Sequence, residues 1–104
     1  MSLSSIVNRA RVKICGITRL EDAISAANLG VDAIGLVFYA ESTRFVKLSL
    51  AAEIAATVGP FVSVVGLFVN APVHQVNEAI TSVGLDILQF HGDEDEVYCS
   101  QFSK

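Results

Sequence analysis

The stretches GVDAIGLVF at positions 30–38 and GLDIL at positions 84–88 repeat one short pattern that points to the fold of the chain. In each copy, a glycine suited to end a helix is followed by an aspartate and then by an apolar strand. A helix-to-strand step that recurs in this way predicts repeated βα units. The near-continuous apolar run at positions 34–38 is typical of a parallel strand that is covered on both faces.

Four apolar, β-branched runs predict four strands. They lie at positions 12–15, 33–38, 63–69 and 87–90. The segments between them have helical periodicity, and a last helix begins in the acidic run at positions 93–96. This alternation predicts a parallel sheet, which is either open and doubly wound or part of a (β/α)8 barrel.

The predicted helices carry sequence signals at their ends. TRLE at positions 18–21 fits a capping box, in which the Thr18 and Glu21 side chains each bond the backbone of the other residue. Ser49 suits the N-cap of the second helix, and Pro72 suits the first turn of the third. Glycines follow the first three helices, as the left-handed position after a helix prefers.

Polar residues on the first and fourth predicted strands favour the barrel. Because side chains alternate between faces, Lys13 and Cys15 share one face of the first strand, and Gln89 and His91 share one face of the fourth. A doubly wound sheet covers both faces with helices, where such polar groups are costly to bury. A barrel accepts polar side chains inside, near its mouth. We therefore expect residues 11–104 to form about four βα units of a single domain, which make half of a TIM (β/α)8 barrel.

Composition and spacing exclude several classes of protein. The chain has 104 residues, of which 52% are hydrophobic and 17% charged, and a net charge of −4. This acidic balance argues against nucleic-acid binding, and the apolar excess suits a piece of a larger fold. Cys15 and Cys99 have no disulfide-framework spacing and no secretory segment precedes them, which predicts a cytoplasmic protein. Residues 1–10 are interpreted as a leader outside the fold.

No metal site, cofactor site or membrane span is expected. The two histidines and two cysteines lack paired-ligand spacing, and the sequence contains no glycine-rich nucleotide loop. Positions 54–73 contain no charged side chain, but glycine and proline interrupt them at two places. These observations predict a protein that works without cofactor, metal or membrane.

Candidate site residues follow from the barrel, whose active sites lie at the C-terminal ends of the strands. Cys15 is either a thiolate base or nucleophile, favoured by nearby Lys13, or a small buried strand residue. Arg44 is either a bidentate fork for a carboxylate or phosphate, or a solvated loop charge. His91 is a substrate contact or a histidine of the rim, and Gly16 lets a ligand approach the backbone closely.

Four motifs occur in order along the chain. They are KICGIT at 13–18, DAIGLVF at 32–38 followed by STRFV at 42–46, VGLFVN at 65–70 and LQFHGDE at 88–94. With these motifs, residues 11–104 strongly resemble the phosphoribosylanthranilate isomerase family, which implies that they form the N-terminal half of its TIM (β/α)8 barrel. Thr43 departs from the family, which usually has proline before the arginine, so this loop is expected to be less rigid.

The resemblance implies the Amadori rearrangement of N-(5-phosphoribosyl)anthranilate to 1-(2-carboxyphenylamino)-1-deoxyribulose 5-phosphate in tryptophan biosynthesis, without a cofactor. It implies Cys15 as the catalytic base, Arg44 as the contact of the anthranilate carboxylate, and His91 as a further substrate-binding residue beside Gly16. The family's general acid lies on a fifth strand and its phosphate site follows strands seven and eight, outside this chain. The chain alone is therefore expected to be inactive, and to self-associate through the exposed edges of a half-barrel.

Two other functions stay open on the sequence. One is a non-catalytic, flavodoxin-like binding module in which Cys15 and Arg44 are structural. The other is a different phosphosugar-barrel enzyme, because a fold alone does not determine a function.

Overall fold

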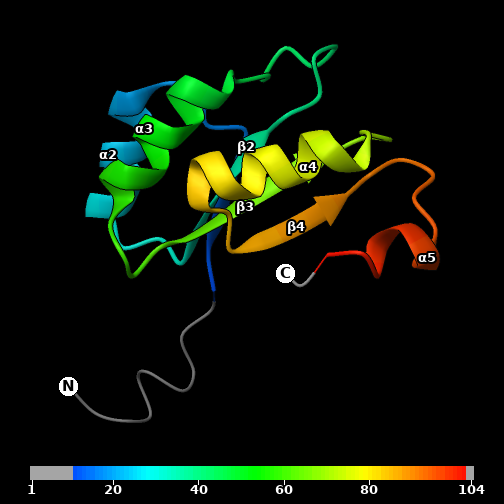
Figure 1. Ribbon diagram of the computed structural model, residues 1–104. Helices are drawn as coiled ribbons and strands as arrows, with labels where there is room; N and C mark the ends of the chain where they lie inside the picture. The colour runs from blue at the N-terminus through cyan, green and yellow to red at the C-terminus, as the bar shows by residue number, and fades with distance from the viewer. Residues whose placement is uncertain (1–10, 103–104) are drawn as a thin grey trace, which may run out of the picture.

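Four parallel strands form the sheet, in the same order in space as along the chain (Figure 1). The structure is a computed structural model that describes residues 11–102. The strands are β1 (Lys13–Cys15), β2 (Ala33–Val37), β3 (Ser63–Phe68) and β4 (Ile87–Phe90). Each differs from its predicted range by at most one residue at either end, so all four predicted strands are confirmed. A doubly wound sheet reverses its strand order at a switch point, whereas this sequential order is that of a barrel wall.

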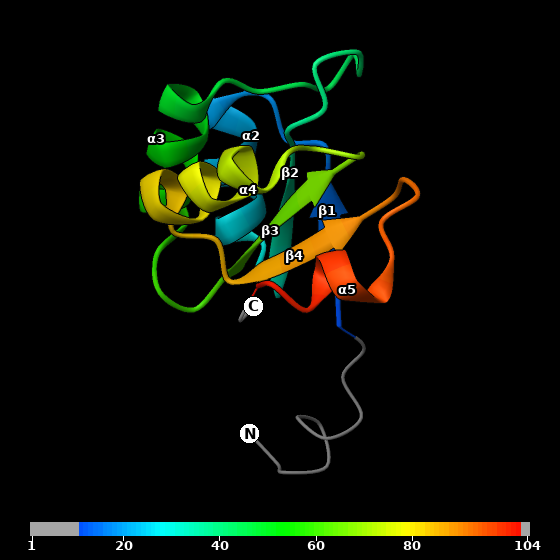
Figure 2. The same cartoon turned by 45° about the vertical axis from the view of Figure 1, so that its right-hand side comes forward.

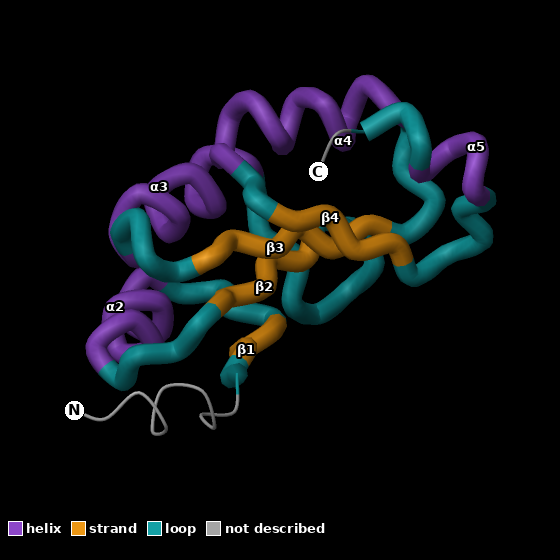
Figure 3. The backbone as a smooth tube through the Cα atoms, turned by 90° about the horizontal axis from the view of Figure 1, so that it is seen from below, coloured by secondary structure: helices purple, strands orange, loops and turns teal. Residues whose placement is uncertain are grey.

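The helices pack along one side of the sheet. Figures 2 and 3 show α2 (Leu20–Asn28), α3 (Leu48–Val58) and α4 (Val73–Ala79) on the same side. A π-helical turn, η1 (Ile80–Gly84), continues α4, and the short α5 (Glu96–Cys99) lies beyond the C-terminal end of β4. None of the helices between residues 11 and 102 is long and apolar enough to cross a membrane.

Two aspartates explain the repeated sequence pattern. Asp32 Oδ2 accepts a hydrogen bond from Val12 N at 2.7 Å, and Asp32 N donates back to Val12 O at 2.9 Å. Asp86 and Val64 form the same pair of bonds, at 2.8 and 2.9 Å. Each aspartate therefore joins the start of its own strand to the start of the preceding one, which sets the register at both sites.

The helix starts differ from the sequence prediction. The prediction of a capping box at Thr18 is wrong, because α2 has Arg19 at its N-cap and no side-chain hydrogen bond caps the helix. Glu21 instead pairs with Arg19 Nε at 3.3 Å, and its own backbone amide and then Arg19 lower the pKa of this carboxyl group. Ser49 lies inside α3 and does not cap it. At α5, the acidic run does supply a cap, since Asp95 Oδ1 accepts from the Tyr98 amide at 2.8 Å.

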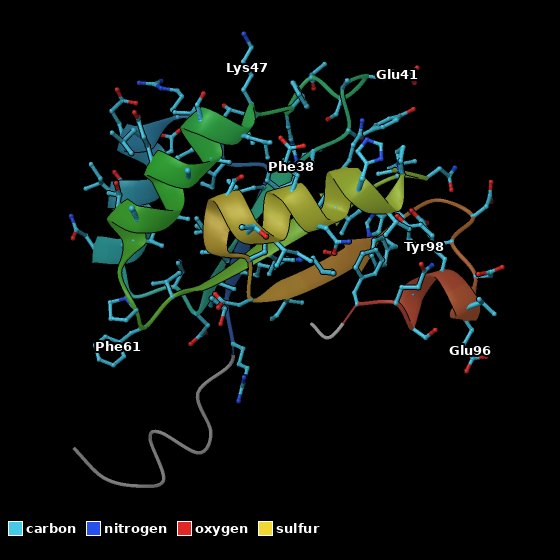
Figure 4. All side chains as sticks on the ribbon, viewed as in Figure 1. Phe38, Glu41, Lys47, Phe61, Glu96 and Tyr98 are labelled. Atoms are coloured by element: carbon cyan, nitrogen blue, oxygen red, sulfur yellow. The ribbon has the colours of Figure 1, made fainter. Side chains whose placement is uncertain are left out.

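The core lies between the helices and the strand face that meets them. Its largest fully buried side chains are Phe68, Ile34, Leu36, Ile54, Leu85 and Val76. Phe68 stacks on Phe38 with 5.3 Å between ring centroids and contacts Phe90 at 6.0 Å. Phe90 continues the row to Tyr98 at 5.4 Å and to Phe102 at 5.6 Å, and Figure 4 labels Phe38 and Tyr98. This row of aromatic rings packs α5 against the helix-covered side of the sheet. The opposite face of the sheet carries the candidate site residues described below.

Candidate functional site

Polar side chains from the two outer strands meet across the sheet face opposite the core. Lys13 Nζ on β1 donates a hydrogen bond to Gln89 Oε1 on β4 at 2.8 Å, although β2 and β3 lie between them. The β2 residues on this face are Ala33 and Gly35, which lie beside Lys13 and Cys15. Both residues are small and leave room for the Lys13 side chain to reach Gln89. The prediction that Lys13 and Gln89 share the inner face is therefore confirmed.

Cys15 is the last residue of β1 and lies opposite Gly35 on β2. Its free thiol is half-buried. A Cβ atom on Gly35 would lie 2.9 Å from Cys15 Sγ and 3.2 Å from Cys15 Cα, so a larger residue there would displace the cysteine. Sequence reasoning did not single out Gly35, because a glycine inside an apolar run gives no sign of what lies opposite it.

The Arg44 side chain packs against Gly16, the residue that follows Cys15. Gly16 has φ +82°, and its amide donates to Gly35 O at 3.0 Å. A Cβ at Gly16 would lie 2.4 Å from Arg44 Cδ and 3.1 Å from both Nε and Nη1. The Arg44 side chain thus lies directly over the residue that follows the cysteine. The positive φ favours glycine there, and a larger residue would displace the Arg44 side chain. The structure brings these three predicted site residues together.

The loop that carries Arg44 folds back on β2. Arg44 N donates to Ser42 Oγ at 3.1 Å, and Phe45 N donates to Ser42 O at 3.2 Å. Val46 N then bonds Val37 O at 3.1 Å, which returns the chain to the sheet. These bonds shape the loop around Thr43.

His91 follows β4 at the same end of the sheet. Its amide donates to Phe68 O at 3.0 Å, and its Nε2 lies 2.7 Å from Gln89 Nε2. The structure therefore joins His91 to the inner-face contact between Lys13 and Gln89, rather than leaving it as an isolated residue of the rim.

Glu94 ties the loops after β3 and β4 together, a role that sequence reasoning missed. Its two carboxylate oxygens accept from Asn70 N and Gly92 N, each at 2.7 Å. Asn70 has φ 50°, and its Oδ1 accepts a hydrogen bond from Asp93 N at 2.7 Å. The acidic run suggested only a helix start, because a carboxylate that binds a distant loop looks the same in sequence as one near a helix end.

Other parts of the fold lie apart from these residues. A cavity of about 470 Å³ opens between the loop after β2 and α4, and Cys15, Arg44 and His91 do not line it. At its edge the Tyr39 hydroxyl donates to Glu41, and this bond raises the pKa of Tyr39. Within residues 11–102, no group of three or more His, Cys, Asp or Glu side chains is placed to hold a metal ion.

Known proteins are similar to this chain in sequence and in fold. A family model described as N-(5′-phosphoribosyl)anthranilate (PRA) isomerase matches residues 12–104. The N-(5′-phosphoribosyl)anthranilate isomerase of Stutzerimonas stutzeri is 57% identical over 94 residues, which are 90% of this chain and 45% of the relative. The chain thus spans about half the length of the curated relatives it matches.

Solved structures agree with this match. The crystal structure of phosphoribosyl anthranilate isomerase from Thermotoga maritima superposes with a TM-score of 0.86 at 41% identity, covering 89% of this chain and 45% of that one. A phosphoribosyl anthranilate isomerase in complex with reduced 1-(o-carboxyphenylamino)-1-deoxyribulose 5-phosphate gives the same TM-score and identity, with 89% and 48% covered. The four-stranded sheet is therefore half of a TIM-barrel fold, and the chain belongs to the N-(5′-phosphoribosyl)anthranilate isomerase family.

Proposed function

We propose that this chain supplies the proton-abstracting and carboxylate-binding half of the active site of an N-(5′-phosphoribosyl)anthranilate isomerase. The observation that carries the proposal is the packing of Arg44 over Gly16, directly beside Cys15, in a chain of this family. The reaction is an intramolecular aldose–ketose rearrangement of the Amadori type in tryptophan biosynthesis, which we expect to run in the cytoplasm.

The proposed chemistry consists of proton transfers. A general acid protonates the ribose ring oxygen, the bond from this oxygen to C1 breaks, and a Schiff base forms between C1 and the anthranilate nitrogen. The Cys15 thiolate then takes the proton from C2, and the electron pair of that bond forms the enolamine. The enolamine gains a proton at C1 and loses one from its C2 hydroxyl, which gives the ketone. In the family the general acid comes from a fifth strand, so this chain contributes the base and not the acid.

Arg44 is proposed to bind the anthranilate carboxylate. A guanidinium presents parallel N–H groups that match the two oxygens of a carboxylate. The chain of Arg44 is held over Gly16, so a carboxylate bound there would place the rest of the substrate close to the end of β1. Gly16 and His91 are proposed as further substrate-binding residues at the same end of the sheet.

A hybrid enzyme tests these roles. In it, this chain is joined to the C-terminal part of the Stutzerimonas stutzeri relative, beyond the region that the chain matches. Arg44→Lys in the hybrid is expected to raise KM for phosphoribosylanthranilate about 10- to 100-fold, because a hydrogen bond to a charged group contributes ~1.5–3 kcal/mol. Steady-state kinetics measures this change.

Arg19→Lys is the matched control for this substitution. The Arg19 side chain is 66% exposed and pairs with Glu21 on α2, so its exchange is expected to leave KM unchanged. Equal KM values for both variants and for the unaltered hybrid would contradict the role of Arg44.

We also propose that the chain alone is inactive and self-associates. β1 and β4 are the two edge strands of the sheet. Val12, which precedes β1, is 48% exposed, and Ile87, the first residue of β4, is 47% exposed. Unpaired edges with apolar side chains are templates for pairing with another chain. Sedimentation velocity is expected to show dimers that increase with concentration and that Ile87→Lys reduces, whereas a monomer at all concentrations would contradict self-association.

A further inference from the structure

The contacts around Gln89 determine which nitrogen of His91 carries a proton. The Lys13 ammonium can only donate hydrogen bonds, so the Gln89 atom that faces it at 2.8 Å is the oxygen. The amide nitrogen of Gln89 then points the other way and lies 2.7 Å from His91 Nε2. An amide nitrogen also only donates, so His91 Nε2 must accept through its lone pair. A neutral imidazole that accepts at Nε2 carries its hydrogen on Nδ1.

We propose that Gln89, oriented by Lys13, is a positioning residue that holds His91 as the Nδ1–H tautomer. In this state His91 offers an N–H donor to an acceptor oxygen of the substrate. The part of the inference that concerns substrate rests on the proposed function, whereas the tautomer itself follows from the three side chains alone.

The geometry leaves Nδ1 available to a ligand. Among residues 11–102, Gln89 is the hydrogen-bond partner of the His91 ring, and Nδ1 has none. The phosphosugar and carboxylate groups of the proposed substrate are rich in acceptor oxygens, for which an N–H donor is the matching group. A donor that is oriented before the substrate arrives costs less to order on binding, which is the advantage of holding the tautomer in advance.

Lys13 and Gln89, the two residues that orient the His91 ring, are anchored independently of His91. Lys13 lies on β1, which is paired with β2, and Gln89 lies on β4, which is paired with β3. His91 itself is held through its amide on Phe68 O at 3.0 Å. The ring and the amide that orients it are therefore both fixed to the end of β4.

The tautomer is measured directly by nitrogen-15 NMR of the histidine rings in the 104-residue chain, above the pH range in which imidazole titrates. The chain has two histidines, and the other, His74, is exposed on α4 and serves as an internal reference. Free histidine side chains favour the Nε2–H tautomer. We expect His91 to show Nδ1–H and His74 to show mostly Nε2–H.

Two substitutions separate the role of Gln89 from a general effect on the fold. Gln89→Glu keeps an acceptor for Lys13 but removes the donor to His91, and Gln89→Leu removes both. Each is expected to move His91 towards Nε2–H and leave the His74 signals in place. Nε2–H at His91 in the unaltered chain, or an Nδ1–H state that persists in both variants, would overturn the proposal.

The hybrid enzyme tests the link to substrate. Gln89→Leu is expected to lower kcat/KM about tenfold, the effect of one lost hydrogen bond, whereas Gln75→Leu on the exposed surface of α4 is expected to leave it unchanged. An inactive hybrid whose His91 is Nδ1–H would count against the proposed function and not against the tautomer. An active hybrid in which Gln89→Leu shifts the tautomer and leaves kcat/KM unchanged would overturn the substrate part of the inference.

Discussion

Cys15→Ser is expected to lower kcat of the hybrid enzyme by about 10²- to 10⁴-fold, the usual contribution of a positioned general base. A serine hydroxyl has nearly the shape of the thiol but is far less acidic, so almost none of it is ionised to take the C2 proton. The half-buried Cys15 lies opposite Gly35, where the smaller oxygen fits without moving the backbone. KM is expected to change little, because the substitution leaves Arg44 and the substrate-binding groups in place.

Cys99→Ser is the control for this substitution. Cys99 is the other free cysteine of the described chain and is the last residue of α5. Its exchange is expected to leave kcat unchanged. A Cys15→Ser hybrid that is folded and retains full kcat would contradict the assignment of the base.

Phe68→Ala is expected to have the largest effect on stability, a loss of about 3–5 kcal/mol. Phe68 is 1% exposed and lies between Phe38 and Phe90, so its removal opens a cavity between β3 and the helices and breaks the aromatic row. Urea unfolding of the chain at a fixed concentration, followed by circular dichroism, measures the loss. Because a small domain is stable by only about 5–15 kcal/mol, Phe68→Leu gives a milder variant that is expected to stay folded.

Phe61→Ala is the matched control for the stability measurement. The Phe61 ring is 95% exposed and points away from the fold in Figure 4, so its loss is expected to change the unfolding free energy by less than about 0.5 kcal/mol. A Phe68→Ala chain as stable as the Phe61→Ala chain would show that the aromatic row does not hold the sheet to the helices.

The strand pattern and the choice of barrel were predictable because both depend on periodicity. Alternation placed Lys13 and Gln89 on one face, and the hydrogen bond between their side chains confirms this placement. The repeated aspartates were visible as a pattern, but their bonds to Val12 and Val64 were not, since each depends on a strand pairing that the sequence does not state.

Contacts between distant loops could not be predicted in the same way. Glu94 lies in an acidic run that is typical of a helix start, yet its carboxylate accepts hydrogen bonds from Asn70 N and Gly92 N. The prediction of a capping box at Thr18 was wrong although the local motif is present, because α2 begins after Arg19 without a side-chain cap. Short motifs describe what a segment can form, and the tertiary contacts decide whether it does.

The rate at which the hybrid enzyme consumes phosphoribosylanthranilate shows whether this chain can supply half of an isomerase active site. The substrate is fluorescent, and its signal is lost as it rearranges. We expect rapid turnover by the hybrid and none by the C-terminal part of the Stutzerimonas stutzeri relative alone, because the base and the carboxylate site are proposed to lie on this chain. A hybrid that is folded by circular dichroism but shows no turnover would refute the proposed function and leave only the half-barrel fold.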